Sequence, residues 1–300
     1  MTYLVVGGGG FLGSYFIREL KKRGHTVVAT AQNIEGLQNE ETLTWMQCGV
    51  TNGAEVDRVL QKMETMAPYH VLYLAACHHP DVVQKNPKMA WDINITALAS
   101  FLNKASGVAS FFYPSTDTVY GEGREDYAFR EEDALKPVNT YGTHKVLAEK
   151  MVTTYGYHVV RYPFLVGTSL SPRKKHFYDV IHETIAAGTP MEMFADSYRS
   201  TLSFRQAAEL TLDLTELPQD TVPHVLNVAA DDALSKYDVG LKIAEKYGVS
   251  PDLVVPITIH KAEGIFEAPR AATTLIDNTK LKKVLGLSEI HLSLESEGDL

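Results

Sequence analysis

Apolar and polar positions form two kinds of pattern along the first half of the chain. Short runs of apolar, β-branched or aromatic residues occur at 3–6, 26–30, 71–76, 109–113 and 158–161, with a weaker run at 43–48. Runs of this length predict buried strands. Between them, apolar residues recur at helical spacing in 11–22, 56–66, 90–105 and 140–155. Strands that alternate with helices predict β-α-β units and a parallel sheet covered on both faces.

The regular alternation weakens after about residue 163. We therefore expect a Rossmann-type doubly wound α/β domain over residues 1–163 and a smaller C-terminal α/β substrate lobe over residues 164–300. An apolar run near 224–230 is predicted to return to the sheet as a late strand. Further helices are expected in the lobe at roughly 235–247 and 278–285.

The composition narrows the class of protein. A chain of 300 residues can bury one large core plus a smaller lobe. The formal net charge of -9, from 28 basic and 37 acidic residues, argues against a nucleic-acid-binding surface. No secretory signal peptide is visible, and no stretch approaches the ~18 apolar residues of a membrane span. A cytoplasmic localisation is therefore expected. Cys48 and Cys77 lie in or beside apolar runs, which predicts reduced thiols and no metal site.

A glycine-rich segment separates the first predicted strand from the first predicted helix. Gly7, Gly8, Gly10 and Gly13 satisfy both G-x-G-x-x-G and G-x-x-G-x-x-G. Glycine permits a tight turn, lets the backbone approach a pyrophosphate and lets the helix pack close to the strand, while the helix N-terminus faces the phosphate charge. The segment predicts dinucleotide binding, and a glycine turn without a ligand is the competing interpretation.

The sequence leaves the type of dinucleotide open between NAD and NADP. NAD-binding domains usually carry a carboxylate at the end of the second strand, whereas Thr30, Ala31 and Gln32 stand there in this chain. No arginine is present at that position to meet a 2′-phosphate either. Gly49 offers no side chain where related folds place an aspartate near the adenine, so other groups must contact this base.

Tyr141 and Lys145 are four residues apart in a predicted helix and share one face. An isolated tyrosine titrates at about pH 10 and is a poor acid or base at neutral pH. A neighbouring ammonium, with the positive charge of an oxidised nicotinamide, is expected to lower that pKa. Thr116 ends the strand one loop earlier, at the ligand-binding edge of open α/β sheets, and can hydrogen-bond the substrate oxygen that Tyr141 protonates or deprotonates. Thr116, Tyr141 and Lys145 are the predicted catalytic residues.

These segments together resemble the extended short-chain dehydrogenases/reductases that act on nucleotide sugars, in the NAD-dependent epimerase/dehydratase superfamily. The segments that carry the resemblance are 7–13, 74–76, 115–121 and 141–145, with Asn94. Within the group, the chain looks most like the dTDP-4-dehydrorhamnose reductase branch at 115–117, 131–133, 137–142 and 269–281. The resemblance covers nearly the whole chain.

The resemblance implies an oxidoreductase that uses NADP or NAD to reduce the C4 carbonyl of a nucleotide sugar. Tyr141 would donate the proton, Thr116 would orient the carbonyl and Lys145 would tune the tyrosine. The implied cofactor contacts are Gly7, Gly10, Phe11, Leu12, Gly13, Thr30, Gln32, Leu74, Ala75, Ala76, Asn94, Tyr141, Lys145, Tyr162 and Phe164.

Charged residues near the expected substrate cleft are candidates for contact with the substrate, because guanidinium groups pair with phosphate in a fork. The weak candidates are Asp117, His78, Arg173, Arg199 and Arg270. For the basic residues, a merely solvated side chain is the competing interpretation. For His78, it is a loop histidine without a ligand.

Other functions stay open beside the reductase. A 4-epimerase uses the same three residues but retains its cofactor tightly, and a reductase of a different substrate class is a further option. A 4,6-dehydratase is disfavoured because Thr118, and not glutamate, follows Asp117. The alternative of another class is a non-catalytic NAD(P)-binding regulatory subunit. The predicted helices at 90–105 and 140–155 can pair with a second copy as a four-helix bundle, or pack within the monomer.

Overall fold

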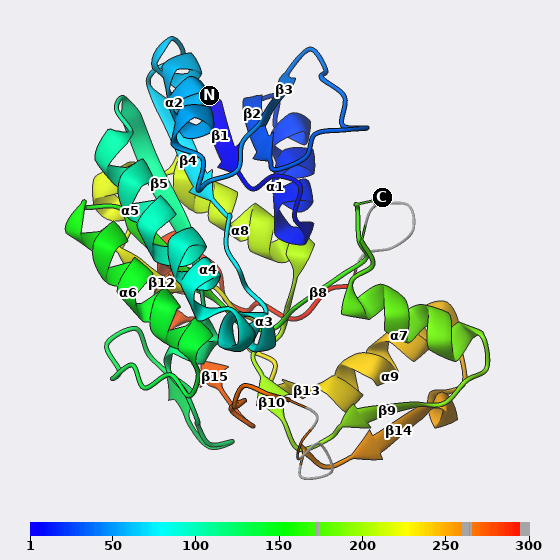
Figure 1. The fold of residues 1–300 in the computed structure, drawn as a ribbon. Helices are drawn as coiled ribbons and strands as arrows, with labels where there is room; N and C mark the ends of the chain where they lie inside the picture. Colours follow the sequence, from blue (N-terminus) through cyan, green and yellow to red (C-terminus); the bar gives the residue numbers. More distant parts are fainter. Residues whose placement is uncertain (172–173, 260–263, 265, 295–300) are drawn as a thin grey trace.

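A seven-stranded parallel sheet forms the centre of the computed structural model, which describes residues 1–171, 174–259, 264 and 266–294. The strand order is β12-β7-β5-β4-β1-β2-β3, and each neighbouring pair is parallel (Figure 1). The strands are β1 (Thr2–Val6), β2 (Thr26–Ala31), β3 (Leu43–Gln47), β4 (Tyr69–Tyr73), β5 (Val108–Thr116), β7 (His158–Tyr162) and β12 (Val225–Asn227). The predicted doubly wound parallel sheet is confirmed.

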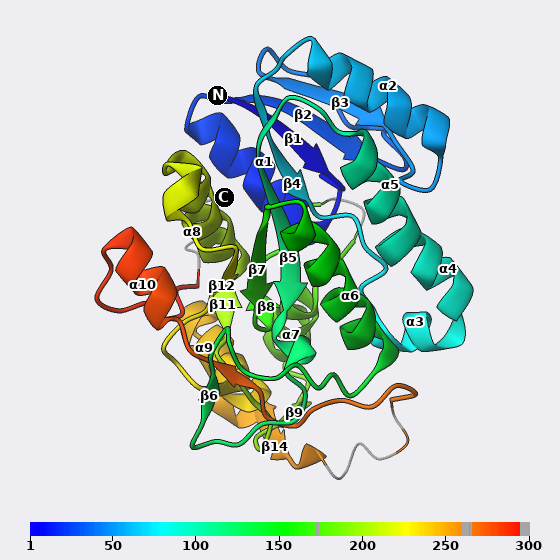
Figure 2. The ribbon, with the colours of Figure 1, turned by 90° about the vertical axis from the view of Figure 1, so that its left-hand side faces the viewer.

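Helices cover both faces of this sheet (Figure 2). On one face lie α1 (Phe11–Lys22) and α8 (Phe204–Glu216), and on the other lie α2 (Gly53–Glu64), α5 (Ala97–Lys104) and α6 (Thr140–Thr154). The segment 90–105, expected as one helix, is divided. The chain forms α3 (Pro80–Lys85) and α4 (Pro87–Trp91), then a π-helical turn at Asp92–Thr96, and only then α5. In the described residues, no helix is long and apolar enough to cross a bilayer.

A second cluster of apolar side chains lies beside the sheet, between α7 (Phe177–Ala186), α9 (Lys236–Tyr247) and the parallel pair β9 (Met191–Phe194) and β14 (Val254–Ile257). This lobe stands to one side of the sheet in Figure 1. Short strand pairs connect the two parts: β8 (Leu165–Val166) with β11 (Leu202–Ser203), β10 (Tyr198–Arg199) with β13 (Leu234–Ser235), and β6 (Ala128–Phe129) with β15 (Leu275–Ile276). The remaining elements are α10 (Thr279–Leu285) and the 3-10 turns Asp117–Val119, Gln219–Thr221 and Pro251–Leu253.

A buried ion pair ties α6 to the centre of the sheet. Arg161 of β7 donates to both carboxylate oxygens of Glu149 in α6, from Nε at 3.0 Å and from Nη2 at 2.6 Å. The hydroxyl of Ser115 in β5 donates to the same carboxylate. Arg161 Nη1 donates to the Tyr120 hydroxyl at 2.7 Å, and that hydroxyl donates to Asn227 Oδ1 in β12 at 2.8 Å. The network therefore joins α6, β5, β7 and β12.

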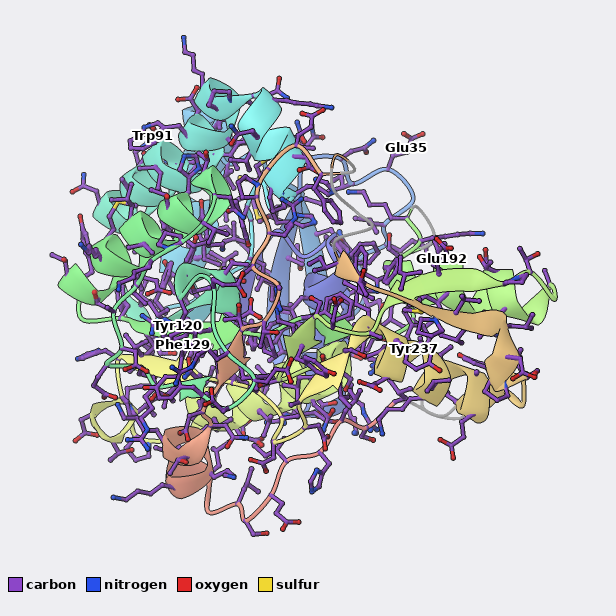
Figure 3. The ribbon with its side chains drawn as sticks, turned by 90° about the horizontal axis from the view of Figure 1, so that it is seen from below. Glu35, Trp91, Tyr120, Phe129, Glu192 and Tyr237 are labelled. Carbon is purple, nitrogen blue, oxygen red and sulfur yellow. The ribbon has the colours of Figure 1, made fainter. Side chains whose placement is uncertain are left out.

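The ring of Tyr120 continues this network toward the C-terminal segments. It stacks on Phe129 with ring centroids 4.9 Å apart and planes at 6°, and Figure 3 shows the two side chains next to each other. Asn227 Nδ2 donates to the carbonyl oxygens of Phe129 and Asp277, each at 3.0 Å. Buried polar groups are therefore satisfied across four separate stretches of the chain, which fixes their relative positions.

We expect Arg161→Met to lower the free energy of unfolding by about 3–5 kcal/mol, because it leaves the Glu149 carboxylate buried without its cation. Chemical denaturation at neutral pH measures the loss. Asp57→Asn is the control, since its pair with Lys104 at 2.7 Å is exposed on both sides and should contribute less than about 1 kcal/mol. Equal losses in the two variants would contradict the structural role given to the buried pair.

Candidate functional site

The loops that follow β1 and β4 meet at the carboxyl edge of the sheet. β1 and β4 are neighbours, and the chain leaves them in opposite directions, which creates the crevice where open α/β sheets bind ligands. The contact is close, because a Cβ on Gly7 would lie 2.9 Å from the backbone nitrogen of Ala75. Leu74 and Ala75 therefore lie against the glycine loop and Ala76 follows them, while the contact of all three with a cofactor stays a prediction.

The glycine loop has the backbone shape that the sequence predicts. Gly7 has φ +86°, and its N–H donates to the Thr30 hydroxyl at 3.1 Å. Gly13 lies in the first turn of α1, where a Cβ would approach the carbonyl oxygens of Gly7 and Gly8 to 2.8 Å. Gly10 is exposed and caps α1 without a side chain. Thr30 thus supports the loop from behind and is itself buried.

This loop fits the pyrophosphate of a dinucleotide. The first turn of α1 contains no acidic residue, so the positive end of the helix is not neutralised locally. Gly9 and Gly10 leave its N-terminus uncovered, and Phe11 and Leu12 follow as partly buried residues. Exposed backbone N–H groups at a helix N-terminus are the donors that phosphate groups use.

The end of the sheet expected to meet the adenine carries a carboxylate that sequence reasoning missed. Glu55 Oε2, from the first turn of α2, accepts the backbone N–H of Gly49 at 2.7 Å. A Cβ on Gly49 would lie 3.6 Å from this oxygen and 4.0 Å from Cγ of Gln32, so the carboxylate reaches the region of Gln32. The signal available in the sequence was the helix start at Asn52, which caps α2 through Glu55 N–H.

Lys145 and Tyr141 lie on the inner face of α6, next to the end of β5. Lys145 Nζ donates to the Tyr113 hydroxyl at 3.0 Å and to the Pro114 carbonyl at 2.7 Å, and lies 5.9 Å from the centroid of the Tyr141 ring. In the part of the chain that the structure describes, no group hydrogen-bonds the Tyr141 phenol. The phenol is therefore available to an incoming substrate oxygen.

The two side chains have opposite pKa shifts. Burial raises the pKa of Tyr141 well above its usual value, and the neighbouring Asp117 carboxylate and Cys77 thiol raise it further. Burial lowers the pKa of Lys145 to about 7, against the opposing attraction of Glu149. The expected lowering of the Tyr141 pKa by Lys145 is absent in the protein alone, because the ammonium points to Tyr113 and Pro114. Tyr141 is consequently a protonated phenol.

Thr116 stands at the last position of β5 beside this pair. Its hydroxyl donates to Asp117 Oδ1 at 3.1 Å and accepts from the hydroxyl of Thr118 at 3.0 Å. The Asp117 carboxylate that accepts from Thr116 also raises the pKa of the Tyr141 phenol, which links the end of β5 electrostatically to the start of α6. The structure brings together all three predicted catalytic residues.

Asn94 holds the loop after β4 in place. Its side-chain oxygen accepts the Cys77 N–H at 2.8 Å and its Nδ2 donates to the Cys77 carbonyl at 3.0 Å, while Nδ2 also lies 3.4 Å from His144 Nδ1. Asn94 is in the π-helical turn, a feature frequent at functional sites. Asn94 therefore links the loop after β4 to His144 of α6, and its contact with a cofactor stays a prediction.

Two further cofactor candidates differ in their environment. Tyr162 lies in the core, where its hydroxyl pairs with that of Thr211 in α8, so its side chain faces the helix layer and not the crevice. Phe164 is partly buried and forms an edge contact with Phe177, at 6.5 Å between ring centroids. It lies between the sheet edge and the lobe.

The arginines predicted for substrate phosphate have internal partners. Arg199 donates to the carbonyls of Tyr198, Ala271 and Ala272 at 2.6–2.8 Å, and its Nε lies 3.2 Å from Asp117 Oδ2. Arg270 pairs with Asp81 at 3.0 Å. These contacts hold the 266–273 segment against the rest of the chain, so neither guanidinium presents a free fork to a ligand. Asp117 is likewise buried and paired and does not face solvent.

His78 and Arg173 complete the predicted substrate residues. His78 lies in the loop after β4. Partial desolvation lowers the pKa of its imidazole, and the positive charges of Lys145 and His79 lower it further. Its contact with a substrate stays a prediction. Arg173 lies outside the described residues. Among the residues that the structure describes, no group of histidine, cysteine or acidic side chains could hold a metal ion.

The model of the family described as "RmlD substrate binding domain" matches residues 1–294. This chain belongs to that family. It is 24% identical over 290 residues to methionine adenosyltransferase 2 subunit beta of Danio rerio, covering 95% of this chain and 85% of that protein. It is 25% identical to a probable low-salt glycan biosynthesis reductase of Haloferax volcanii, covering 96% of this chain and 94% of that protein. The resemblance to the reductase branch is confirmed at the level of the family.

Solved structures share the fold of this RmlD-family chain. A hypothetical dTDP-4-dehydrorhamnose reductase from Sulfolobus tokodaii superimposes with a TM-score of 0.78 at 22% identity, covering 99% of this chain and 100% of that one. A UDP-glucuronic acid 4-epimerase from Bacillus cereus, in complex with UDP-glucuronic acid and NAD, gives a TM-score of 0.79 at 20% identity, covering 97% and 95%. The fold is that of the extended short-chain dehydrogenases/reductases.

In this RmlD-family chain we expect Gly13→Ala to weaken dinucleotide binding and to lower the free energy of unfolding by about 1–3 kcal/mol, because the added Cβ overlaps the backbone of the loop. Calorimetric titration and chemical denaturation measure the two effects. Gly53→Ala is the matched control, since its Cβ would meet only the end of Lys104 at 3.9 Å. A Gly13→Ala protein that binds as well as the control would show that the loop does not hold the ligand.

Proposed function

We propose that this chain is a nicotinamide-dependent reductase of a nucleotide sugar, with Tyr141 as the proton donor to a 4-keto group. The observation that carries the proposal is the position of the Tyr141 phenol, which has no hydrogen-bond partner in the described residues and whose ring centroid lies 5.9 Å from Lys145 Nζ, near the end of the strand that carries Thr116. The three residues lie at the sheet edge that also holds the glycine loop. The membership of the RmlD family and the fold shared with a dTDP-4-dehydrorhamnose reductase support the substrate class.

The residues of the crevice fit NAD or NADP. Gly7 to Gly13 would hold the pyrophosphate, Gln32 and Glu55 lie near the end of β2 where the adenosine half is expected, and Leu74 to Ala76 would border the nicotinamide half. Similar folds have been solved with NAD and with NADP. When bound, the nicotinamide supplies the hydride that reduces the carbonyl carbon.

The protein residues handle the proton and the orientation of the substrate. Thr116 would turn its hydroxyl hydrogen from Asp117 Oδ1 to the carbonyl oxygen of the substrate, and Tyr141 would transfer its phenolic proton to the same oxygen. Lys145, anchored at Pro114, would place its ammonium near the ribose of the cofactor and beside the phenolate that Tyr141 becomes. A C=O group thereby gains one hydride on carbon and one proton on oxygen.

The second candidate is a regulatory subunit that binds a dinucleotide without turnover. The relative from Danio rerio is named a subunit of methionine adenosyltransferase, and it matches nearly the whole chain. The presence of Thr116, Tyr141 and Lys145 in one site favours the enzyme. The 4-epimerase alternative stays a prediction, and so does the homodimer, for which the outer faces of α5 and α6 provide a shallow apolar hollow around Leu102, Met151 and Tyr155.

Titration of the purified protein with NADH and, separately, with NADPH tests the first step of the proposal. Binding of one or both supports a nicotinamide cofactor, and the preferred one decides between NAD and NADP. Absence of binding at millimolar concentration, in folded protein free of retained nucleotide, would overturn the reductase and the dinucleotide-binding subunit together.

We expect Tyr141→Phe to lower kcat for a 4-keto nucleotide sugar by about 10²–10⁴-fold, because the proton donor is lost while the ring remains. Dinucleotide affinity should stay unchanged. Tyr155→Phe, near the far end of the same helix and half-exposed, is the control and should keep full activity. Full activity of the Tyr141→Phe protein would contradict the mechanism.

A further inference from the structure

One lysine at the junction between the sheet and the lobe is surrounded by aromatic rings. Lys236 is the first residue of α9, and its Nζ lies 5.7 Å, 5.6 Å and 5.5 Å from the ring centroids of Phe164, Phe177 and Phe194. The three rings come from different elements: the segment after β7, the start of α7 and the end of β9. Tyr237, the next residue, is labelled in Figure 3 and marks this end of α9.

The Lys236 ammonium has no anionic partner in the described part of the chain. The charged groups that act on it are Arg199 and Arg270, both positive. Burial among the rings, and then these two charges, lowers the pKa of Lys236 to about 8. An ammonium that is partly removed from water and repelled by two guanidinium groups gains more from an anion than an exposed lysine does.

The two neighbouring arginines, Arg199 and Arg270, have fewer free hydrogen-bond donors for an anion than Lys236 has. Each is bound to a carboxylate, Asp117 for Arg199 and Asp81 for Arg270, and to backbone carbonyl groups. Their positive charge still contributes to the local potential, but their N–H groups are occupied. Lys236 keeps its three donors, because the aromatic rings attract its charge without accepting directed hydrogen bonds.

We propose that Lys236 binds the diphosphate of a nucleoside diphosphate at this junction, an inference that rests on the proposed nucleotide-sugar substrate and names the residue that recognises it. A diphosphate carries the concentrated negative charge that the ammonium and the two nearby guanidinium groups favour. The faces of Phe164, Phe177 and Phe194 provide apolar surface of the kind on which a nucleobase or a sugar packs.

The competing interpretation is that Lys236 only packs over aromatic rings. Lys246 provides a matched comparison, because it lies on the same helix with its Nζ 5.7 Å and 5.2 Å from the rings of Tyr178 and Tyr247. Lys246 has the same type of aromatic contact at the opposite end of α9, away from the junction. A purely structural role predicts similar consequences for the two lysines.

The test compares Lys236→Met, Lys236→Arg and Lys246→Met with the unchanged protein. Calorimetry would measure binding of UDP and dTDP, with uridine and thymidine as probes without phosphate, in the presence of saturating NADPH or NADH where either binds. Methionine retains the length of lysine and fits among aromatic rings but removes the charge. Chemical denaturation would verify that each variant is folded.

We expect Lys236→Met to raise the Kd of the nucleoside diphosphates at least about tenfold, and Lys236→Arg to keep it within about threefold, since the arginine restores the charge. Lys246→Met should change neither. The affinity of the unchanged protein should fall with added salt more steeply than that of Lys236→Met. Binding of the nucleosides, where measurable, should not depend on Lys236.

Three results would overturn the inference. The first is equal nucleoside diphosphate affinity in the unchanged and Lys236→Met proteins. The second is an equal loss in Lys246→Met. The third is no binding of UDP or dTDP at millimolar concentration by a protein that binds NADH or NADPH, which refutes the role of Lys236 and leaves the nicotinamide cofactor intact. If neither NADH nor NADPH binds, the proposed oxidoreductase is refuted. The UDP and dTDP titrations then still decide whether Lys236 binds a diphosphate.

Discussion

The buried pair between Glu149 and Arg161 is the interaction on which the site depends. α6 carries Tyr141 and Lys145, while β5 carries Thr116, and no covalent constraint keeps a surface helix in register with a sheet. Glu149 lies one turn after Lys145 and accepts hydrogen bonds from Arg161 in β7 and Ser115 in β5. Bidentate geometry fixes both direction and rotation of the helix, which apolar packing alone does not.

The same carboxylate acts electrostatically on the site. Glu149 opposes the effect of burial on Lys145, so that this lysine retains part of its tendency to hold a proton. The Arg161 guanidinium, in turn, offsets the negative charge of Glu149 within the core. Hydrogen bonds therefore run from Asn227 through Tyr120 and Arg161 to Glu149, and the charge of Glu149 acts from there on Lys145.

The sequence was sufficient for the sheet and for the edge at which Thr116, Tyr141 and Lys145 lie, and insufficient for charge pairing. β1 and β5 are apolar runs whose ends are marked by Gly7 and Thr116, so local pattern and position located the crevice. Arg199 looked like a phosphate ligand, but its partners Asp117 and Ala272 lie far away in the sequence. Lys236 carried no motif, because its three aromatic neighbours are contributed by separate elements. Long-range partners of single charged residues leave no periodic signal.

The opposite pKa shifts of Tyr141 and Lys145 bear on the direction of the reaction. Reduction of a carbonyl needs a proton donor, whereas a reaction that begins by oxidising a hydroxyl group needs a base. In the protein alone, burial and the neighbouring Asp117 carboxylate raise the pKa of the phenol, and the Lys145 ammonium is directed at Tyr113 and Pro114. The residues of the site thus supply an acid without further change. A 4-epimerase must instead generate a phenolate here, and the positive charge of an oxidised nicotinamide would then have to offset the burial of Tyr141.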